Sequence, residues 1–503
     1  MAQLTAAVPL PGRTRDLMKR AVIIVLALLP VVGVAQTKDL LGVFEDALQS
    51  DPVIRQAEAN RRAARESKPQ ALAALLPQVN GTASVIRDHN TGTQPFFATT
   101  SSGAPIVVPL PAGVDTTTKS WGLTLRQNIF SWANWMSLKG ASAQVAQAEA
   151  TYQAAEQQLI LRVGQAYFNV LTAVDTLEAD QAALEAIARQ QDQAEKRFEV
   201  GLIAITDVED ARAARDTAAA TVVADKRALA TSEDQLQEIT GQKYDRLAKP
   251  GDDMPLLNPE PADEGRWVSM SLEQNPTLIS SRLAADIARD NVHVAFGAHL
   301  PTLDLVAGRS WQSQSLDENF AGQPFSYDTY FNDRQIGLQF TLPLFSGGLD
   351  QSKVRQAQYL WIAAKEGVVQ SSRATERQAR DAYLGVISGI SHVHALRQAL
   401  ESNQTALKAT EAGYEVGTRT SVDLVTARRN LVQAQTNYAV ARYDYIVSVL
   451  TLRLAAGTLD RPELKAVNGW LTASAATSPA VETPETLAPT IPSSQPSPPP
   501  PPK

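Results

Sequence analysis

The sequence predicts a mixed fold in which β-strands of the outer-membrane barrel type, four per chain, continue into very long coiled-coil helices. Three observations support this prediction. Short motifs recur about 216 residues apart, the helical stretches keep a seven-residue apolar repeat, and two segments in each half alternate apolar with polar residues. The chain is therefore internally duplicated, with strands and helices in both halves.

Composition argues against several classes of function. The 503 residues carry a net charge of −7, whereas a nucleic-acid-binding protein would show a basic patch or stripe, so we expect no nucleic-acid partner. Because the chain has no cysteine, it cannot form disulfides, thiolate metal sites or a thiol nucleophile. Hydrophobic residues make up 44% of the chain, which is enough for a core, so general disorder is not expected.

The first 35 residues have the pattern of a secretory signal peptide. Basic residues precede an apolar run over residues 21–34, and Gly33 and Ala35 supply small side chains before the predicted cleavage at Gln36. The run is shorter than the ~20 apolar residues that span a bilayer, and an N-terminal anchor helix is the alternative. We therefore predict an exported chain whose translation starts at Met1 or Met18.

Two copies of one unit fill most of the chain. Val200 and Gly201 recur as Val416 and Gly417. Further pairs keep the same spacing: Asp207/Asp423, Ala211/Ala427, Arg212/Arg428 and Gly241/Gly457. We assign residues 36–241 to the first repeat and residues 266–457 to the second, joined by a linker at residues 242–265.

The C-terminal residues are rich in proline. Ten of the 29 prolines lie between Pro479 and Pro502. Because a segment of this composition cannot pack a core, we predict that residues 473–503 form a disordered, extended tail. A proline-rich docking ligand is the alternative role for this tail.

Each repeat contains two segments with the alternation of barrel strands. They lie at about residues 78–88 and 120–130 in the first copy and at about 302–312 and 334–345 in the second. Aromatic residues stand near their ends, as in outer-membrane strands: Trp121, Phe130, Trp311 and Phe345. The joining segments, at about 90–118 and 312–333, are rich in Gly, Ser, Thr, Asn and Pro, so we expect surface loops there. Alternation by itself also allows half-buried soluble hairpins.

Two helices of unusual length are predicted, at residues 132–199 and 349–415. In the first, apolar residues recur every seven positions, which is typical of supercoiled helices, at Leu138, Val145, Tyr152 and Leu159. At 1.5 Å per residue each helix would be about 100 Å long. Both are expected to end at a Val-Gly pair, after which shorter helices at residues 204–240 and 421–456 run back.

The predicted strands require more than one chain. A sheet that spans a membrane must close on itself, because each unpaired backbone group in lipid costs several kcal/mol. Four strands are too few, since the smallest known barrels have eight. At least two chains must then share one barrel, and the helices that follow the strands would continue it as a conduit.

Two stretches at the predicted helix turns carry a family resemblance. Residues 198–208 (FEVGLIAITDV) and 414–424 (YEVGTRTSVDL) closely resemble the TolC family of outer-membrane channels, as do residues 237–241 and 439–445. The likeness covers about residues 37–460. It implies a homotrimer with a 12-stranded barrel in the outer membrane, a 12-helix coiled-coil barrel in the periplasm, and an equatorial belt that includes residues 458–472.

The resemblance also implies a function. Members of the family serve as the exit duct of tripartite efflux pumps and of type I protein secretion. A periplasmic adaptor (membrane fusion) protein and an inner-membrane RND or ABC transporter open the duct at its helical tip. Cargo and partner pump stay undetermined. A periplasmic coiled-coil scaffold without a pore is the alternative.

An exported enzyme is the second alternative, and the sequence lacks the motifs that would support it. The five histidines are scattered, and no nucleophile elbow, HExxH zinc motif or Walker A loop occurs in the sequence. We therefore expect no catalytic residue, no metal and no cofactor.

Six residues at the two helix turns correspond to the adaptor-docking grooves of the family. They are Val200, Gly201, Leu202, Val416, Gly417 and Thr418. The alternative is that the two glycines only terminate their helices.

Further residues near the turns correspond to the periplasmic gate of the family. Tyr414 and Arg419 match one side of the links between neighbouring helix pairs, and Thr206 and Asp207 match the other. The chemistry is suitable, because a guanidinium offers several directed donors to a hydroxyl and a carboxylate. Ordinary solvated surface groups are the alternative.

Asp423 matches a constricting aspartate of the family. Three copies facing one axis would repel one another, so we expect the pKa of Asp423 to rise and cations to collect there. The second acidic position of the family is Thr426 here, which should weaken cation selectivity.

Overall fold

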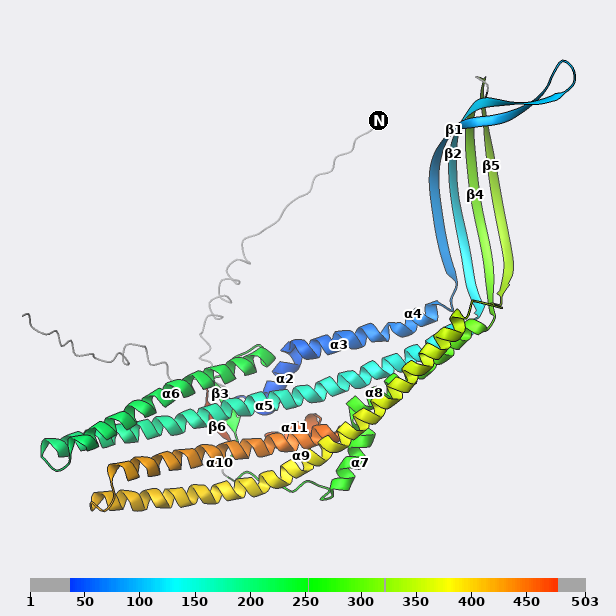
Figure 1. Cartoon of the computed structure of the whole chain (residues 1–503). Helices are drawn as coiled ribbons and strands as arrows, with labels where there is room; N and C mark the ends of the chain where they lie inside the picture. The colour runs from blue at the N-terminus through cyan, green and yellow to red at the C-terminus, as the bar shows by residue number, and fades with distance from the viewer. Residues whose placement is uncertain (1–36, 252, 321–322, 478–503) are drawn as a thin grey trace, which may run out of the picture.

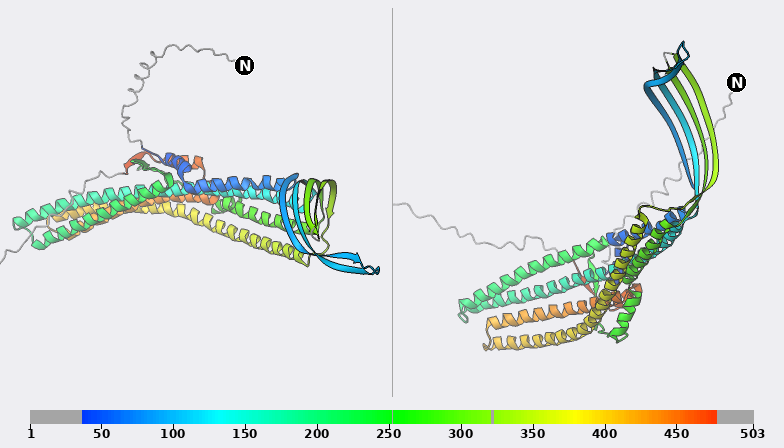
Figure 2. Two further views of the ribbon diagram at one scale, coloured as in Figure 1. Left: turned by 90° about the horizontal axis from the view of Figure 1, so that it is seen from above. Right: turned by 45° about the vertical axis from the view of Figure 1, so that its right-hand side comes forward.

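Residues 37–251, 253–320 and 323–477 are described by a computed structural model, so the predicted signal peptide lies outside the described residues, as does the predicted tail from residue 478. A sheet of four strands stands at one end of a long set of helices (Figure 1). A small layer of helices and strands covers the helices near their middle, and the sheet is curved (Figure 2).

Four helices form the long part of the molecule as two hairpins. α5 (Trp132–Glu199) turns into α6 (Ile205–Thr240), and α9 (Leu349–Glu415) turns into α10 (Ser421–Ala456). Their order across the molecule is α6, α5, α10, α9 (Figure 1). Both return helices end at glycines in the left-handed region, Gly241 with φ +72° and Gly457 with φ +76°.

Shorter helices continue the return helices toward the sheet. In space, α3 (Pro52–Arg65) extends the line of α6 toward the sheet, and α8 (Pro276–Phe296) extends the line of α10. Each starts with a proline, whose preset φ and missing amide suit the first helical position. The capping residue precedes it: the Asp51 carboxylate accepts from the Ile54 amide at 3.1 Å, and the Asn275 side chain caps α8.

The remaining helices are short. They are α2 (Leu40–Ser50), α4 (Ser67–Ala73), α7 (Glu264–Gln274), the 3-10 helix η1 (Gly297–His299) and α11 (Arg461–Asn468). None of the described helices is both long enough and apolar enough to cross a membrane.

The sheet contains β1 (Gln78–Thr99), β2 (Pro105–Phe130), β4 (Thr302–Phe320) and β5 (Gln323–Thr341). The order is β1-β2-β4-β5, and every neighbouring pair is antiparallel. β1 and β5 therefore each have one edge without a strand partner in the described chain. Large apolar side chains on these strands are exposed, among them Val85 at 72%, Ile336 at 79% and Leu338 at 67%.

The predicted surface loops at 90–118 and 312–333 were wrong, because strands occupy most of both segments. β1 and β2 pair continuously from Gln78 opposite Arg126 to Thr99 opposite Pro105. Prolines are tolerated because β1 is an edge strand, and β2 pairs with β4 only from Ala112 onward. The segment rich in proline and glycine is therefore the two-stranded ribbon of β1 and β2, which extends beyond the four-stranded part of the sheet.

The segment at 473–477, predicted as part of a disordered tail, is also ordered. β6 (Ala473–Ala476) pairs antiparallel with β3 (Arg246–Lys249), which lies in the predicted linker. The Thr477 amide continues the pairing by donating to the Asp245 carbonyl at 2.9 Å. Backbone pairing of this kind needs no apolar side chains, so composition could not reveal it.

The main core lies where this small layer covers α5 and α10. Tyr167 is fully buried there, and its hydroxyl donates to the Ala248 carbonyl at 2.5 Å. Phe168 stacks on Tyr443 of α10 with 5.6 Å between ring centroids. The contact between Phe168 and Tyr443 therefore joins the two hairpins directly near their middle.

Candidate gate and docking site at the hairpin tips

Each hairpin reverses at a short turn that contains a glycine. The turns lie at residues 200–204 and 416–420, and Gly201 and Gly417 have φ of +76° and +79°. The Leu202 amide donates to the Arg197 carbonyl at 2.9 Å, and the Thr418 amide to the Gly413 carbonyl at 2.8 Å. A Cβ on either glycine would meet no atom within 4 Å, so the positive φ alone accounts for glycine.

Apolar side chains project into solvent at both tips. Val200 is 69% exposed, Leu202 73% and Val416 75%. Gly201, Gly417 and Thr418 lie between or beside them and are also exposed. The structure thus gathers the six predicted docking residues into two exposed turns at the same end of the molecule (Figure 1). These exposed apolar side chains are available for contact with another protein.

The predicted gate residues divide between the two tips. Tyr414 lies under the Arg197 guanidinium, with 5.3 Å from Cζ to the ring centroid, so α9 contacts α5 there. Arg419 is exposed, and its amide donates to the Gly413 carbonyl at 3.2 Å. Within the described protomer, no hydrogen bond or ion pair joins Tyr414 or Arg419 to Thr206 or Asp207.

Asp423 has a local role that the sequence analysis did not predict. It forms a capping box at the start of α10, in which its carboxylate accepts from the Thr420 amide and hydroxyl, both at 3.0 Å. In return, the Asp423 amide donates to the Thr420 hydroxyl at 3.2 Å. The spacing Thr-x-x-Asp before a helix was the available signal.

The capping box sets the pKa of Asp423 within one protomer. The hydrogen bonds from the Thr420 amide and hydroxyl, followed by the charge of Arg419, lower the pKa of Asp423 there. The carboxylate is therefore ionised at neutral pH and remains a fixed negative charge at the tip. The rise expected from three copies facing one axis concerns the assembly and stays a prediction.

Arg428 of α10 has a role that the sequence analysis did not predict. One guanidinium nitrogen donates to the Ala186 carbonyl of α5 at 2.8 Å, and another lies 3.3 Å from the Glu411 carboxylate of α9. Arg428 therefore bridges the two hairpins close to their tips. Its recurrence as Arg212 in the first repeat was the signal that could have found it.

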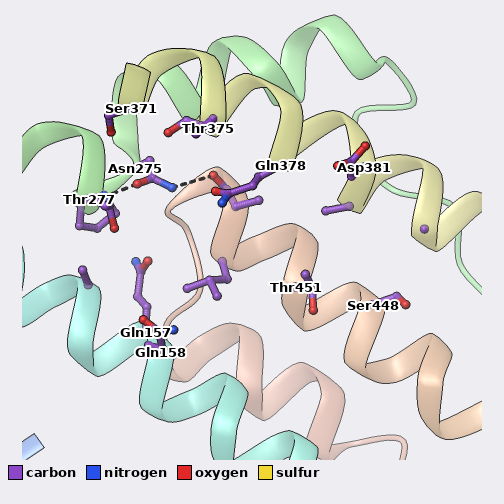
Figure 3. Close-up of a pocket in the computed structure, with 17 residues that line it drawn as sticks. Gln157, Gln158, Asn275, Thr277, Ser371, Thr375, Gln378, Asp381, Ser448 and Thr451 are labelled. Carbon is purple, nitrogen blue, oxygen red and sulfur yellow. Dashed lines mark hydrogen bonds between the residues drawn. The ribbon is translucent and has the colours of Figure 1, made fainter. Parts of the chain in front are cut away.

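A hollow of about 610 Å³ lies where α8 continues α10, between α5 and α9 (Figure 3). The Asn275 side chain spans the break, accepting from the Thr277 amide at 3.0 Å and donating to the Ala455 carbonyl at 3.1 Å. Most polar side chains that line the hollow are uncharged. Asp381 is a charged lining residue, and its carboxylate lies 3.0 Å from the Arg377 guanidinium. Among the described residues no group of three or more His, Cys, Asp or Glu could hold a metal ion.

Comparison with known proteins assigns the family. The sequence matches the family model described as outer membrane efflux protein over residues 43–242 and 267–458. It is 35% identical over 470 residues to the outer membrane protein TolC of Escherichia coli strain K12, covering 92% of this chain and 91% of that protein. The chain belongs to the outer membrane efflux protein family.

Further known proteins are similar to this chain in sequence or in fold. The TolC of Vibrio cholerae serotype O1 is 36% identical over 436 residues, covering 86% of this chain and 94% of that protein. The crystal structure of the Campylobacter jejuni CmeC outer membrane channel superposes with a TM-score of 0.64 at 19% identity. It covers 93% of this chain and 98% of that one.

Family membership fixes the location and the class of the protein. The chain is an outer-membrane channel protein, with its sheet at the outer membrane and its helical part in the periplasm. The alternative of a periplasmic scaffold without a pore is therefore wrong. The two ranges that match the family model fall one in each half of the chain, in agreement with the duplication.

Proposed function

We propose that three copies of this chain assemble into one channel, which serves as the exit duct of a tripartite efflux pump or of type I protein secretion. One observation carries the proposal: a sheet with exposed apolar faces and two unpaired edges leads directly into 68- and 67-residue helices. No catalytic step, metal or cofactor is part of the proposed function.

The unpaired edges of the sheet supply the reason for assembly. β1 and β5 each offer a row of backbone donors and acceptors that lipid cannot satisfy, at several kcal/mol per group. Pairing β5 of one chain with β1 of the next satisfies both edges. Three chains then give 12 strands, which is enough for closure.

The helices supply the passage and its gate. Around a trimer, the tip with Tyr414 and Arg419 stands beside the tip with Thr206 and Asp207 of an adjacent hairpin. An exposed pair of this kind contributes about 0.2–1 kcal/mol, so links repeated three times hold the entrance shut by a few kcal/mol at most. Binding of another protein at the tips can overcome a barrier of that size.

Docking at the tips is assigned to the exposed apolar turns. Val200, Leu202 and Val416 offer contact area to a periplasmic adaptor protein, which in turn connects to an inner-membrane RND or ABC transporter. The ionised Asp423 carboxylates lie close to the gate and favour cations at the entrance.

Fractionation and electrophysiology test the proposal. We expect the protein in the outer membrane, a heat-sensitive trimer band on gels, and discrete conductance steps in planar bilayers. A monomer that leaves liposomes sealed would contradict the channel. Deleting the gene and measuring antibiotic sensitivity and the secreted proteome then separates efflux from protein secretion, since each route changes a different readout.

A further inference from the structure

The duplication allows contacts within one chain to be compared with positions that have no neighbour in the chain. α10 lies between α9 of its own hairpin and α5 of the other (Figure 1). α6, its counterpart, packs along α5, while α9 lies at the far side of the four helices (Figure 1). In a closed ring of hairpins, α6 of one subunit therefore comes to lie beside α9 of the next.

Burial differs at matched positions in the way that a missing neighbour predicts. Phe168 on α5 is 2% exposed because Tyr443 of α10 stacks on it. Its counterpart on α9, Leu384, is 54% exposed. On the other side, Ile446 of α10 is fully buried, whereas its counterpart Ala230 on α6 is exposed. The outer faces of α6 and α9 therefore correspond in sequence to the faces of α10 and α5 that cover each other within the chain.

One of the contacts between the two hairpins within the chain is a bridge formed by Arg428. Arg428 holds Glu411 of its own hairpin at 3.3 Å and the Ala186 carbonyl of the adjacent hairpin at 2.8 Å. Its side chain is only 21% exposed. The bridge therefore combines a charge pair within a hairpin with a directed hydrogen bond between hairpins.

The first repeat contains the same parts without the second hairpin. Arg212 on α6 corresponds to Arg428, and Glu195 on α5 corresponds to Glu411. Arg212 is 55% exposed and lies 3.4 Å from Glu209, one turn away on its own helix. The position that corresponds to Ala186 is Ser402, which is exposed on α9.

We propose that α6 of one subunit packs against α9 of the partner subunit as α10 packs against α5, and that Arg212 completes a bridge between subunits. In that bridge Arg212 pairs with Glu195 of its own chain and donates to the backbone carbonyl of Ser402 of the partner subunit. The occupant of the exposed α6 and α9 faces is a second copy of this chain. This inference rests on the proposed assembly into a trimeric channel.

The bridge lies close to the gate, so it is placed to set how firmly neighbouring hairpins are held. Arg212 is less than two helical turns beyond Thr206 and Asp207 on α6. The trimer would then carry arginine bridges at every hairpin contact, alternating between Arg428 within subunits and Arg212 between them. Lysine could not replace Arg212 fully, because it lacks the fork that serves two acceptors at once.

Because the natural chain has no cysteine, paired cysteine variants provide a clean test in the full-length protein. We expect Arg212→Cys combined with Ser402→Cys to give cross-linked dimers and trimers when membranes are treated with a short bis-maleimide. Arg428→Cys combined with Ala186→Cys should react within one chain and leave the monomer mass unchanged. Arg212→Cys with Gln404→Cys is the matched control, since residues two apart on a helix face different directions.

The outcomes separate this inference from the proposed channel. Severalfold more cross-linking for the Ser402 pair than for the Gln404 pair supports the bridge. A trimer that conducts but cross-links no better through Ser402 than through Gln404 overturns the bridge and leaves the channel standing. Absence of any trimer overturns both.

A second measurement examines the bridge without cysteines. Arg212→Ala should lower the temperature at which the trimer band dissociates on gels. Arg215→Ala, on the same helix and 50% exposed beside Asp216, should leave that temperature unchanged. Equal dissociation temperatures for the natural protein and the Arg212→Ala variant would contradict a bridging role.

Discussion

The two hairpin tips share a backbone path but differ in how their return helices begin. Both turns use a glycine with φ near +80°, Gly201 and Gly417. At the second tip, Thr420 and Asp423 form a capping box at the start of α10. At the first tip, the position of Thr420 is taken by Ala204, which provides no side-chain cap for α6. Asp207, the counterpart of Asp423, therefore lacks the hydroxyl that would hold its carboxylate.

The difference shows how a duplicated unit divides its roles. The turn geometry is kept in both copies because the chain must reverse in both. Asp423 caps its own helix, and the hydrogen bonds of that cap lower its pKa. The other aspartate stays available to a donor on a neighbouring hairpin, as the proposed gate requires. Four experiments can break or sharpen this comparison.

The largest effect is expected at the glycines that both tips share. Gly417→Ala and Gly201→Ala should each cost about 1–2 kcal/mol per chain, because alanine resists the left-handed conformation while its Cβ would meet no atom within 4 Å. Thermal unfolding followed by the helical circular dichroism signal measures this cost. Gly367→Ala, inside α9 and equally free of contacts, should instead stabilise the helix by roughly 0.5–1 kcal/mol. Clearly unequal costs at the two tips would show that their turns are not equivalent.

The second experiment removes the donor proposed to reach Asp207. Arg419→Ser should shift the balance between closed and open entrance roughly tenfold toward opening, if three links of about 0.5 kcal/mol each are lost. Single-channel conductance in planar bilayers should rise accordingly. Arg429→Ser, exposed on α10, is the matched control and should leave the current unchanged. An unaltered current in the Arg419 variant would remove this residue from the gate.

The third experiment gives the first tip the cap of the second. Ala204→Thr should build a capping box with Asp207 and stabilise α6 by about 1 kcal/mol. Because the new hydroxyl competes for the Asp207 carboxylate, conductance should also rise, though less than in the Arg419→Ser variant. Ala204→Val adds a similar volume without a hydroxyl and should change neither quantity in this way. A stabilised helix with unchanged conductance would mean that Asp207 does not hold the entrance.

The smallest effect concerns a carboxyl group that only the first hairpin carries. Burial, followed by the negative charge of Asp180 and a hydrogen bond to it, raises the pKa of Asp225 to about 6. The folded hairpin therefore binds this proton more tightly than the unfolded chain. The contribution of Asp225 to stability is present below about pH 4 and is lost as the pH rises through about 6.

Comparing the two hairpins at this position tests the pH dependence. The counterpart of Asp225 in the second copy is the buried Ala441. Asp225→Ala should flatten the fall in melting temperature between pH 4.5 and pH 7.5. A fall of the same size in the variant would assign the pH dependence to other groups.

Sequence patterns predicted the helical part of the fold well, because the signals are local. The seven-residue apolar repeat of α5 runs from Leu138 to Leu184 with one four-residue step after Leu159. The glycines that end the helices need no distant partner to adopt positive φ. The same patterns misjudged residues 90–118, where proline and glycine suggested a loop. Edge strands accept these residues because one side of their backbone has no ladder to complete.

The candidate site was predicted only where the family motif supplied it. Val200, Leu202 and Val416 fall at exposed turns, and Arg419 and Asp207 lie at the tips as the motif implied. The roles of Thr420 and Arg428 were not predicted from the sequence. The cap formed by Thr420 changes what Asp423 does, and the bridge formed by Arg428 joins α5, α9 and α10. The sequence carried a signal for each, the spacing Thr-x-x-Asp and the recurrence of Arg428 as Arg212, but the hydrogen-bond partners follow only from the tertiary structure.

The amino-acid sequence by itself determined the duplication, the long helices, the glycine turns and the family, because each depends on neighbours along the chain or on a contiguous motif. Only the tertiary structure decided the pairing of Arg246–Lys249 with Ala473–Ala476, the full length of the strands and the contacts of Arg428. These features join segments that are far apart in sequence. Their free energy depends on helices having already brought the segments together, so no local pattern can encode them.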